Sequence, residues 1–191
     1  AYLSPGLGIS GGNLERDLNT FIRLGTQHHT DVSMVKTWVS NSKYRKAWVF
    51  DCLTQHVLSK KPNPKISILG LAYKPNTHSV KNSPSFILIN HLKGLQVHAH
   101  DPIVTENQGA EIQLHQDIDS AIQGSDVLII MLACEEYKKL NITHILSLMR
   151  GKTIIDPFQT LKLENNPAKE YAYFCLGKSV QTIGEREETY A

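Results

Sequence analysis

The amino-acid sequence predicts an α/β fold: a parallel β-sheet flanked by helices on both faces and preceded by a long helix. From residue 65 onward, short apolar runs alternate with segments of helical periodicity, which is the pattern of strand–helix–strand units. Ahead of them, residues 31–59 contain neither proline nor glycine and repeat apolar residues near a period of 3.6. The composition, 41% hydrophobic and 20% charged over 191 residues, is typical of a globular protein and excludes collagen-like and disordered chains.

The N-terminal third is expected to hold a loop and two helices. A glycine-rich loop covers Pro5–Gly12, and a helix follows over residues 13–25. The second helix, over residues 31–59, would extend about 40 Å if it ran unbroken. A helix of that length serves as a connector or an association surface; a core helix broken near Asn41-Ser42 is the alternative.

The α/β domain is expected over residues 61–180, after the segment Lys60–Lys65 with its two prolines, and residues 181–191 form a polar tail that is expected to fray. Five apolar runs are predicted strands: 65–72, 96–100, 127–134, 153–156 and 173–176. Four segments between them are predicted helices: 84–93, 117–123, 135–140 and 142–148. Ligands of such sheets bind at the carboxyl ends of the strands.

Charge, cysteine usage and hydropathy narrow the class of function. The 20 basic residues, against 18 acidic ones, are scattered, which argues against nucleic-acid binding. No apolar run approaches the ~18–20 residues of a membrane span, and the sequence opens without a secretory signal. Cys52, Cys134 and Cys175 lie far apart in apolar stretches, as buried reduced thiols of a cytoplasmic protein do. His98 and His100 share a strand face but lack a third ligand, so no metal site is expected.

Two loops are the candidate ligand sites. Gly6–Gly11 has the spacing G-x-G-x-x-G, but no strand precedes it, so it is not a dinucleotide fingerprint. Its backbone N–H groups can still hold an anionic or sugar ligand. After the first predicted strand, a loop carries Lys74 and Lys81 and leads into a helix opened by Ser83 and Pro84. Two cations beside a helix N-terminus suit a diphosphate, and two solvated loop lysines are the alternative.

Two acidic residues lie at the ends of predicted strands, in Asp101-Pro102 and Asp156-Pro157. They stand at the edge of the sheet where a ligand would bind. Forming the turn that follows the strand is an equally suitable role for either residue.

Residues 70–84 carry a resemblance to a known family. They read G-L-A-Y-K-P-N-T-H-S-V-K-N-S-P, similar to the form G-L-A-F-K-x-x-T-D-D-x-R-x-S-P in the C-terminal domain of nucleotide-sugar 6-dehydrogenases. Further similar segments are His100–Pro102, Ser125–Val127, Ile154–Asp156 and Tyr173–Gly177. Pro5–Asp17 aligns without gaps to the family's P-G-x-G-x-G-G-x-C-x-P-x-D loop. The chain thus resembles the UDP-glucose/GDP-mannose dehydrogenase family over nearly its whole length.

The resemblance implies a fold and a set of ligands. The fold is a Rossmann-like parallel sheet flanked by helices, preceded by a long dimerising helix within residues 1–60. The substrate is a UDP- or GDP-sugar, whose C6 alcohol is oxidised toward the uronic acid with NAD as cofactor. In the family this chemistry passes through a cysteine adduct, because a thiolate forms both the thiohemiacetal and a cleavable thioester. The implied substrate-binding residues are Gly8, Ile9, Ser10, Gly11 and Lys74, and the implied cofactor-binding residue is Lys81.

Several positions depart from the family's pattern. Asn13 occupies the position of the nucleophilic cysteine, and an amide nitrogen cannot replace a thiolate. Asp17 matches the aspartate that orients the hydrolytic water; an acid that complements the helix dipole is the alternative. Lys81 replaces an arginine and loses its bidentate geometry. His78-Ser79 replaces an acidic pair, and Phe158 replaces an arginine in a later turn.

Three functional hypotheses follow from the resemblance. The first is that the chain is the C-terminal part of an NAD-dependent nucleotide-sugar dehydrogenase. The family's NAD-binding fingerprint and its catalytic lysine and asparagine are then expected in a preceding domain, and the isolated chain is expected to be inactive. The second is a non-catalytic homologue that serves as a nucleotide-sugar-binding or assembly module. The third is a single oxidation that stops at the aldehyde.

Overall fold

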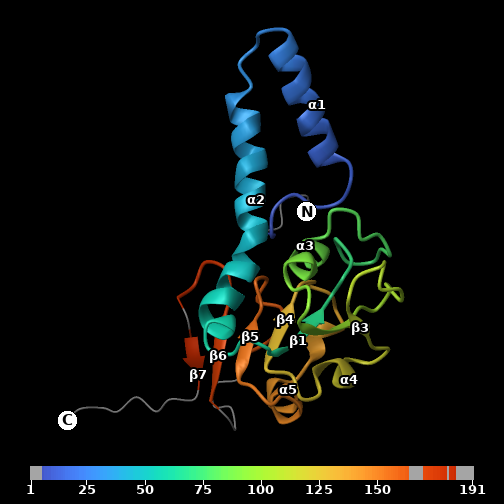
Figure 1. The fold of residues 1–191 in the computed structure, drawn as a ribbon, viewed down its shortest axis with the longest axis vertical. Helices are drawn as coiled ribbons and strands as arrows, with labels where there is room; N and C mark the ends of the chain where they lie inside the picture. The colour runs from blue at the N-terminus through green and yellow to red at the C-terminus, as the bar shows by residue number, and fades with distance from the viewer. Residues whose placement is uncertain (1–5, 164–169, 180, 184–191) are drawn as a thin grey trace, which may run out of the picture.

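The computed structural model describes residues 6–163, 170–179 and 181–183, and Figure 1 shows a helical hairpin standing on an α/β domain. The hairpin is formed by α1 (Leu14–Gln27) and α2 (Ser33–Leu53), and α2 runs directly into the π-helical turn η1 (Thr54–Leu58). The predicted loop followed by two helices is confirmed from residue 6 onward; Pro5 lies outside the described residues. The alternative of a break at Asn41-Ser42 is wrong, because helical backbone continues through both residues.

One face of α2 is turned toward the rest of the molecule. Its buried residues include Ser42, Lys46, Val49 and Leu53, which follow each other at helical spacing. Val49 and Leu53 belong to the hydrophobic core, whereas Ser42 and Lys46 make polar contacts that are described below. In contrast, α1 contains no buried residue at all. The hairpin is therefore anchored through α2.

The α/β domain is built on one sheet with the strand order β3-β2-β1-β4-β5-β6-β7. The strands are β1 (Lys65–Leu69), β2 (Gln96–His100), β3 (Gln113–Leu114), β4 (Val127–Ile130), β5 (Thr153–Ile155), β6 (Tyr171–Phe174) and β7 (Gln181–Ile183). The first six are parallel and β7 is antiparallel to β6. The chain builds outward from β1 on one side and then returns to begin the other side at β4. This is the doubly wound, Rossmann-like order, and the predicted fold class is confirmed.

The strands differ from their predicted bounds in instructive ways. The β2 strand matches its prediction, whereas β1 and β4 end earlier than their apolar runs, because the chain turns into loops at the carboxyl edge. The β3 strand was not predicted, since two residues are too few for a periodic pattern. The predicted frayed tail begins with an ordered strand, because Gln181–Ile183 pairs with β6; residues 184–191 lie outside the described residues.

Three helices connect the strands: α3 (Pro84–His91), α4 (Ile118–Ile122) and α5 (Ile142–Leu148). Each begins with a side chain that accepts a hydrogen bond from a backbone N–H group of the first turn. The caps are Ser83, Asp117 and Asn141. The helix predicted over residues 135–140 is instead the short 3₁₀ helix η2 (Tyr137–Lys139).

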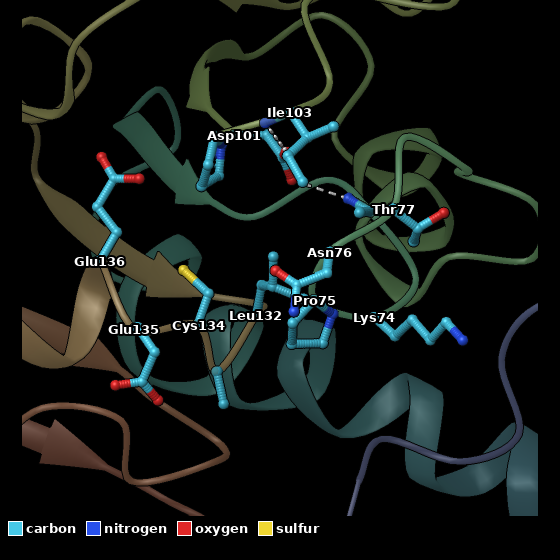
Figure 2. Close-up of a pocket in the computed structure, with 13 residues that line it drawn as sticks. Lys74, Pro75, Asn76, Thr77, Asp101, Ile103, Leu132, Cys134, Glu135 and Glu136 are labelled. Carbon is cyan, nitrogen blue, oxygen red and sulfur yellow. Dashed lines mark hydrogen bonds between the residues drawn. The ribbon is translucent and has the colours of Figure 1, made fainter.

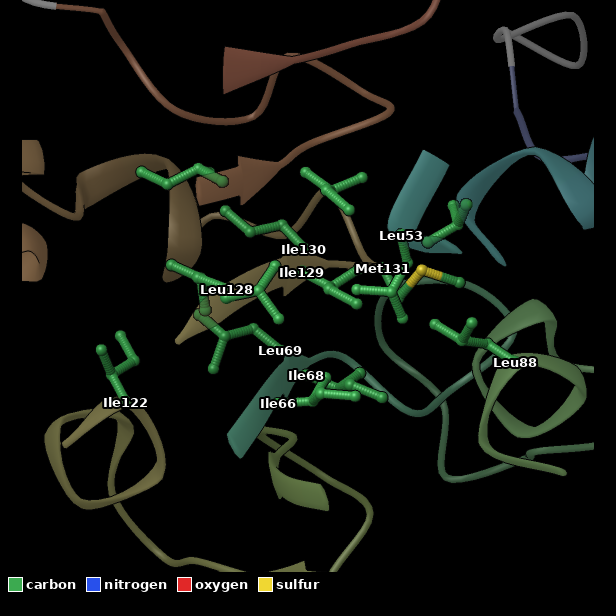
Figure 3. Packing of buried hydrophobic residues seen from close by; sticks show 14 of the residues in the cluster. Leu53, Ile66, Ile68, Leu69, Leu88, Ile122, Leu128, Ile129, Ile130 and Met131 are labelled. Carbon is green, nitrogen blue, oxygen red and sulfur yellow. The ribbon is translucent and has the colours of Figure 1, made fainter. Parts of the chain in front are cut away.

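The central strands β1 and β4 form the middle of the core, which Figure 3 shows from close by. Because side chains alternate along a strand, Ile66 and Ile68 point to one face and Ser67 to the other. The Ser67 hydroxyl donates a hydrogen bond to the carbonyl of Ala121 in α4, which fixes which face α4 covers. Leu53 of α2 lies on the side of Ile66 and Ile68 in Figure 3. Helices thus cover both faces, and the loops at the carboxyl edge remain for a ligand.

Candidate functional site

Two pockets lie side by side at the carboxyl edge of the sheet, and both are lined by Lys74, Pro75, Leu132 and Ala133. The first, which we call the loop pocket, has a volume of about 470 Å³ and lies between the glycine-rich loop and the end of β4. The second, the crevice pocket, has a volume of about 350 Å³ and lies between the segments that follow β1, β2 and β4 (Figure 2). Of the residues predicted to bind substrate, Gly8, Ser10 and Lys74 line the loop pocket.

The glycine-rich loop is held by hydrogen bonds from three separate segments. The Ile9 N–H donates to the Ser42 hydroxyl in α2 at 2.8 Å. The Ser10 hydroxyl donates to the Tyr73 carbonyl at 3.2 Å, and the Asn82 amide donates to the Ile9 carbonyl at 3.3 Å. These bonds join α2, the loop after β1 and the glycine-rich loop into one wall of the loop pocket.

Glycine is required at two positions of this loop. Gly8 and Gly11 have φ angles of +83° and +77°, a region that L side chains rarely adopt. A Cβ atom on Gly8 would lie 2.5 Å from the Ser42 carbonyl oxygen. A Cβ atom on Gly11 would lie 2.9 Å from the Tyr73 ring. The loop can therefore approach α2 and Tyr73 this closely only without side chains.

Beneath the loop lies a buried lysine. Lys46 is 7% exposed, and its ammonium donates to the Asn82 carbonyl oxygen at 2.9 Å and to the Glu15 carboxylate at 3.4 Å. The Asn82 amide in turn donates to Glu15. We call Lys46, Asn82 and Glu15 the clamp, because they connect α2, the loop before α3 and the first turn of α1. Burying an ammonium is costly unless it is paired and hydrogen-bonded, and the clamp meets both conditions.

The predicted catalytic residues lie outside the loop pocket. Asn13 is exposed at the start of α1, and its side chain makes no capping hydrogen bond. The Asp17 carboxylate is 62% exposed and pairs with Arg16 at 2.9 Å. Lys81, the predicted cofactor-binding residue, packs along Gly12, where a Cβ atom would lie 2.7 Å from its Cδ. The roles of Asn13, Asp17 and Lys81 stay predictions.

None of the three cysteines is a candidate nucleophile at the glycine-rich loop. Cys52 and Cys175 are buried, and burial raises the pKa of Cys52 to about 12. Cys134 lines the crevice pocket, and burial also raises the pKa of its thiol. A raised pKa leaves little thiolate at neutral pH, so these three side chains are weak nucleophiles.

The carboxylates of the two strand-end aspartates accept hydrogen bonds, mostly from backbone N–H groups. The Asp101 carboxylate accepts hydrogen bonds from the N–H groups of Leu71, Ala72, Ile103 and Val104, at 2.7 to 3.0 Å. The Asp156 carboxylate accepts from the Leu161 N–H at 2.9 Å and from the Tyr173 hydroxyl at 2.7 Å. For Asp101 the structure shows the turn-forming role, since Ile103 and Val104 follow it directly, and it also places this residue in the lining of the crevice pocket. Asp156 joins the end of β5 to Leu161 and to β6.

The same contacts show that this domain does not fit NAD. In dinucleotide-binding folds, three glycines follow the first strand, and an acidic residue at the end of the second strand binds the ribose. Here the turn after β1 contains Gly70 alone, and the acidic residue in the second position, Asp101, has its carboxylate occupied by four N–H groups. The cofactor contact of Lys81 stays a prediction.

Three histidines on and beside β2 form pairs with each other or with a tyrosine. His98 Nδ1 and His115 Nε2 are 2.7 Å apart, and the two rings stack. Burial, together with Lys65 and His115, lowers the pKa of His98 to about 4. His100 Nδ1 lies 3.1 Å from the Tyr137 hydroxyl. Within residues 6–163, 170–179 and 181–183, no group of three or more His, Cys, Asp or Glu side chains could hold a metal ion.

Sequence reasoning missed Lys138 in the loop pocket and Ser42 in its wall, and it gave Phe158 no place in the pocket. Lys138, from η2, lines the loop pocket, although the sequence shows it only as one of two adjacent lysines. Ser42 holds Ile9, although it was considered only as a helix break. Phe158 lines the pocket, and only its departure from the family's pattern signalled it. None of these positions follows from spacing, because tertiary packing alone brings them to the loop.

Comparison with known proteins extends these observations. Residues 67–163 match the family model described as "UDP-glucose/GDP-mannose dehydrogenase family, UDP binding domain". UDP-glucose 6-dehydrogenase TuaD of Bacillus subtilis is 24% identical over 195 residues, covering 99% of this chain and 42% of the relative. UDP-glucose 6-dehydrogenase of Rickettsia conorii is 29% identical over 189 residues, covering 94% of this chain and 43% of the relative. The chain thus spans about two fifths of the length of these relatives.

Solved structures agree on the fold. The UDP-D-ManNAc dehydrogenase of Pyrococcus horikoshii is 23% identical with a TM-score of 0.73, covering 92% of this chain and 40% of that chain. NDP-N-acetyl-D-galactosaminuronic acid dehydrogenase of Methanosarcina mazei is 21% identical with a TM-score of 0.78, over the same shares of the two chains. Among the described residues, no helix has the length and apolar character needed to cross a membrane.

Proposed function

Because this chain belongs to the UDP-glucose/GDP-mannose dehydrogenase family, we propose that it forms the nucleotide-sugar-binding C-terminal part of an NAD-dependent oxidoreductase. The observation that carries the proposal is the loop pocket, in which Gly8 and Ser10 face Lys74 across the carboxyl edge of the sheet. Backbone groups of a glycine-rich loop and a lysine suit the sugar and phosphate groups of such a substrate.

The reaction proposed for the complete enzyme is oxidation of the sugar's C6 alcohol toward the uronic acid. This chain contributes the substrate pocket to that reaction and, through Lys81, a single cofactor contact. NAD itself is assigned to another domain of the enzyme, since the described residues do not fit it. With Asn13 in the nucleophile position and all three cysteines away from the loop, the chain alone is expected to give no turnover.

A homodimer formed through α2 is part of the proposal. Along its outer part, α2 exposes Met34 by 66% and Trp38 by 52%, and further along it exposes Tyr44 by 72%. Large apolar side chains exposed on one helix favour association. Light scattering should give the dimer mass for the wild-type chain and the monomer mass for Trp38→Glu. A wild-type monomer at high protein concentration would contradict this part of the proposal.

Calorimetric titration tests the binding function. UDP, UDP-glucose and GDP-mannose are titrated into the chain, and at least one is expected to bind. Lys74→Gln should lower its affinity about tenfold, because a charge-assisted contact is lost. Lys93→Gln is the matched control, since this exposed lysine lies just past α3 and lines neither pocket. If neither this chain nor the full-length protein binds any of the three, the proposal fails.

A non-catalytic homologue, serving binding or assembly, is the second candidate. It is favoured by the position of Asn13 and Asp17, which are both exposed outside the loop pocket. The experiment that separates the two candidates is Asn13→Cys in the full-length protein. Recovered oxidation to the uronic acid supports a dehydrogenase site that is otherwise intact, whereas no recovery supports the binding or assembly role. If the enzyme carries out only one oxidation, mass spectrometry of the wild-type product should detect the aldehyde.

A further inference from the structure

The two adjoining pockets differ in charge. The lining of the loop pocket contains Lys74 and Lys138 and no acidic residue. The lining of the crevice pocket contains Lys74 together with Asp101, Glu135 and Glu136. Figure 2 shows the Lys74 side chain extending away from the two glutamates. An anion is therefore attracted to the loop pocket and repelled by the crevice pocket, although both share the same wall.

Lys138 lines the loop pocket from a segment far from the glycine-rich loop in the sequence. It belongs to η2, the short helix that follows β4, so it stands at the carboxyl edge of the sheet. Phe158, which also lines the pocket, brings an aromatic ring but no charge. Lys74 and Lys138 are thus the cations that the described lining offers to a ligand.

The present partner of Lys138 is easily exchanged. Its ammonium lies 2.6 Å from the Glu135 carboxylate, and the two side chains are 46% and 80% exposed. Ion pairs between exposed side chains contribute little to stability, because water and salt screen them. The terminal phosphate of a nucleoside diphosphate carries more charge and more acceptor oxygens than one carboxylate, so it competes well for the same ammonium.

We propose that Lys138 is a diphosphate-binding residue of the loop pocket. On ligand binding it exchanges Glu135 for the distal phosphate of a nucleoside diphosphate, while Lys74 holds the proximal phosphate. The proposal rests on the proposed function, because it assumes that the loop pocket takes the nucleotide end of the substrate. It adds a second phosphate contact. It also gives the pocket a second positive charge, although Phe158 stands where the family's pattern has an arginine.

Titration of the full chain with UDP and with UMP tests the assignment. Lys138→Gln should lower the affinity for UDP about tenfold and leave the affinity for UMP nearly unchanged, because only UDP has the distal phosphate. Lys139→Gln is the matched control, since this neighbour is exposed in the same short helix and lines neither pocket. Lys138→Arg keeps the charge and should retain most of the UDP affinity. Glu135→Gln removes the competing carboxylate and should strengthen UDP binding severalfold at most.

The outcomes separate this inference from the function on which it rests. If the wild-type chain binds neither UDP nor UMP, the nucleotide-binding function is overturned and this assignment falls with it. If UDP binds but Lys138→Gln does not weaken it, only the assignment of Lys138 is overturned. The same holds if Lys138→Gln weakens UDP and UMP equally, or if Lys139→Gln has the same effect as Lys138→Gln. Unchanged circular dichroism and melting temperature confirm that each variant is folded.

Discussion

The hairpin and the α/β domain are stabilised by different means. In the domain, β1 and β4 are covered on both faces, and Ile68 and Ile129 are fully buried. In the hairpin, α1 has no buried residue, and Leu14 and Phe21 are more than half exposed. Burial of apolar surface holds the domain together, and it also anchors the end of α2 through Val49 and Leu53 and the glycine-rich loop through Leu7. The rest of the hairpin and of the loop is held on the domain by polar contacts, namely the clamp and three hydrogen bonds. The loop pocket lies at the boundary, so its shape depends on the weaker of the two arrangements.

The largest expected effect comes from the domain side of this comparison. Ile68→Ala should lower the free energy of unfolding by about 2–5 kcal/mol, because it removes apolar contacts and leaves a cavity in a closely packed core. Leu14→Ala, the matched change on α1, should alter it by less than about 0.5 kcal/mol. Urea denaturation measures both values. Similar losses for the two variants would show that the hairpin contributes to the core in a way that its exposure does not indicate.

The next largest effect on stability is expected for Lys46→Met, which removes the lysine of the clamp. Lys46→Met leaves Glu15 and Asn82 without their cation and should cost on the order of 2 kcal/mol. It should also speed hydrogen exchange at the Ile9 amide, which is bonded to Ser42 in the wild type. Lys43→Met is the control, because Lys43 is exposed on the same helix. Exchange at Ile9 that stays as slow as in the wild type would mean that Ser42 holds the loop without the clamp.

Two glycine variants, Gly8→Ala and Gly94→Ala, test how closely the glycine-rich loop approaches α2. In Gly8→Ala, the new side chain would sit on a backbone with positive φ, and its Cβ atom would clash with the Ser42 carbonyl. In Gly94→Ala, φ is also positive, at +81°, but the space around the position is open. Gly94→Ala should therefore cost about 1 kcal/mol from backbone strain alone. Gly8→Ala should displace the loop and weaken UDP binding as well, which calorimetric titration measures. Equal UDP affinity in the two variants would contradict a tight fit between the loop and α2.

At neutral pH the smallest effect is that of His98, which acts only when the pH is lowered and lies on β2, next to the edge strand β3. The pKa of His98 is about 4 in the folded protein and about 6.5 when exposed, so the unfolded chain binds more protons between these values. Stability should therefore fall as the pH is lowered from about 6.5 to about 4. His98→Asn should flatten this part of the pH profile measured by thermal melting. A profile as steep as that of the wild type would assign the slope to other groups.

The fold was predictable because its signals are local. The strand patterns of β2 and β4 and the helix-start residues Ser83 and Pro84 are visible in the sequence, because each depends on residues that are neighbours along the chain. The short strand β3 carries no periodic signal and was missed.

The candidate site was only partly predictable. Lys74 was found because a known motif contains it, and Gly8 and Ser10 because their loop aligns with the same family. Lys138 and Ser42 were not found, since neither lies in a motif and their place at the pocket depends on how η2 and α2 pack. The role of Asp101 also needed the structure, because only the fold shows the four N–H groups around its carboxylate.

The unbroken course of α2 has a mechanical consequence. The same rod that carries Trp38 near its free end carries Ser42 and Lys46 beside the loop pocket and Leu53 in the core. A partner bound around Trp38 is therefore joined to the wall of the loop pocket by one continuous helix, since Ser42 of that helix holds the Ile9 N–H group.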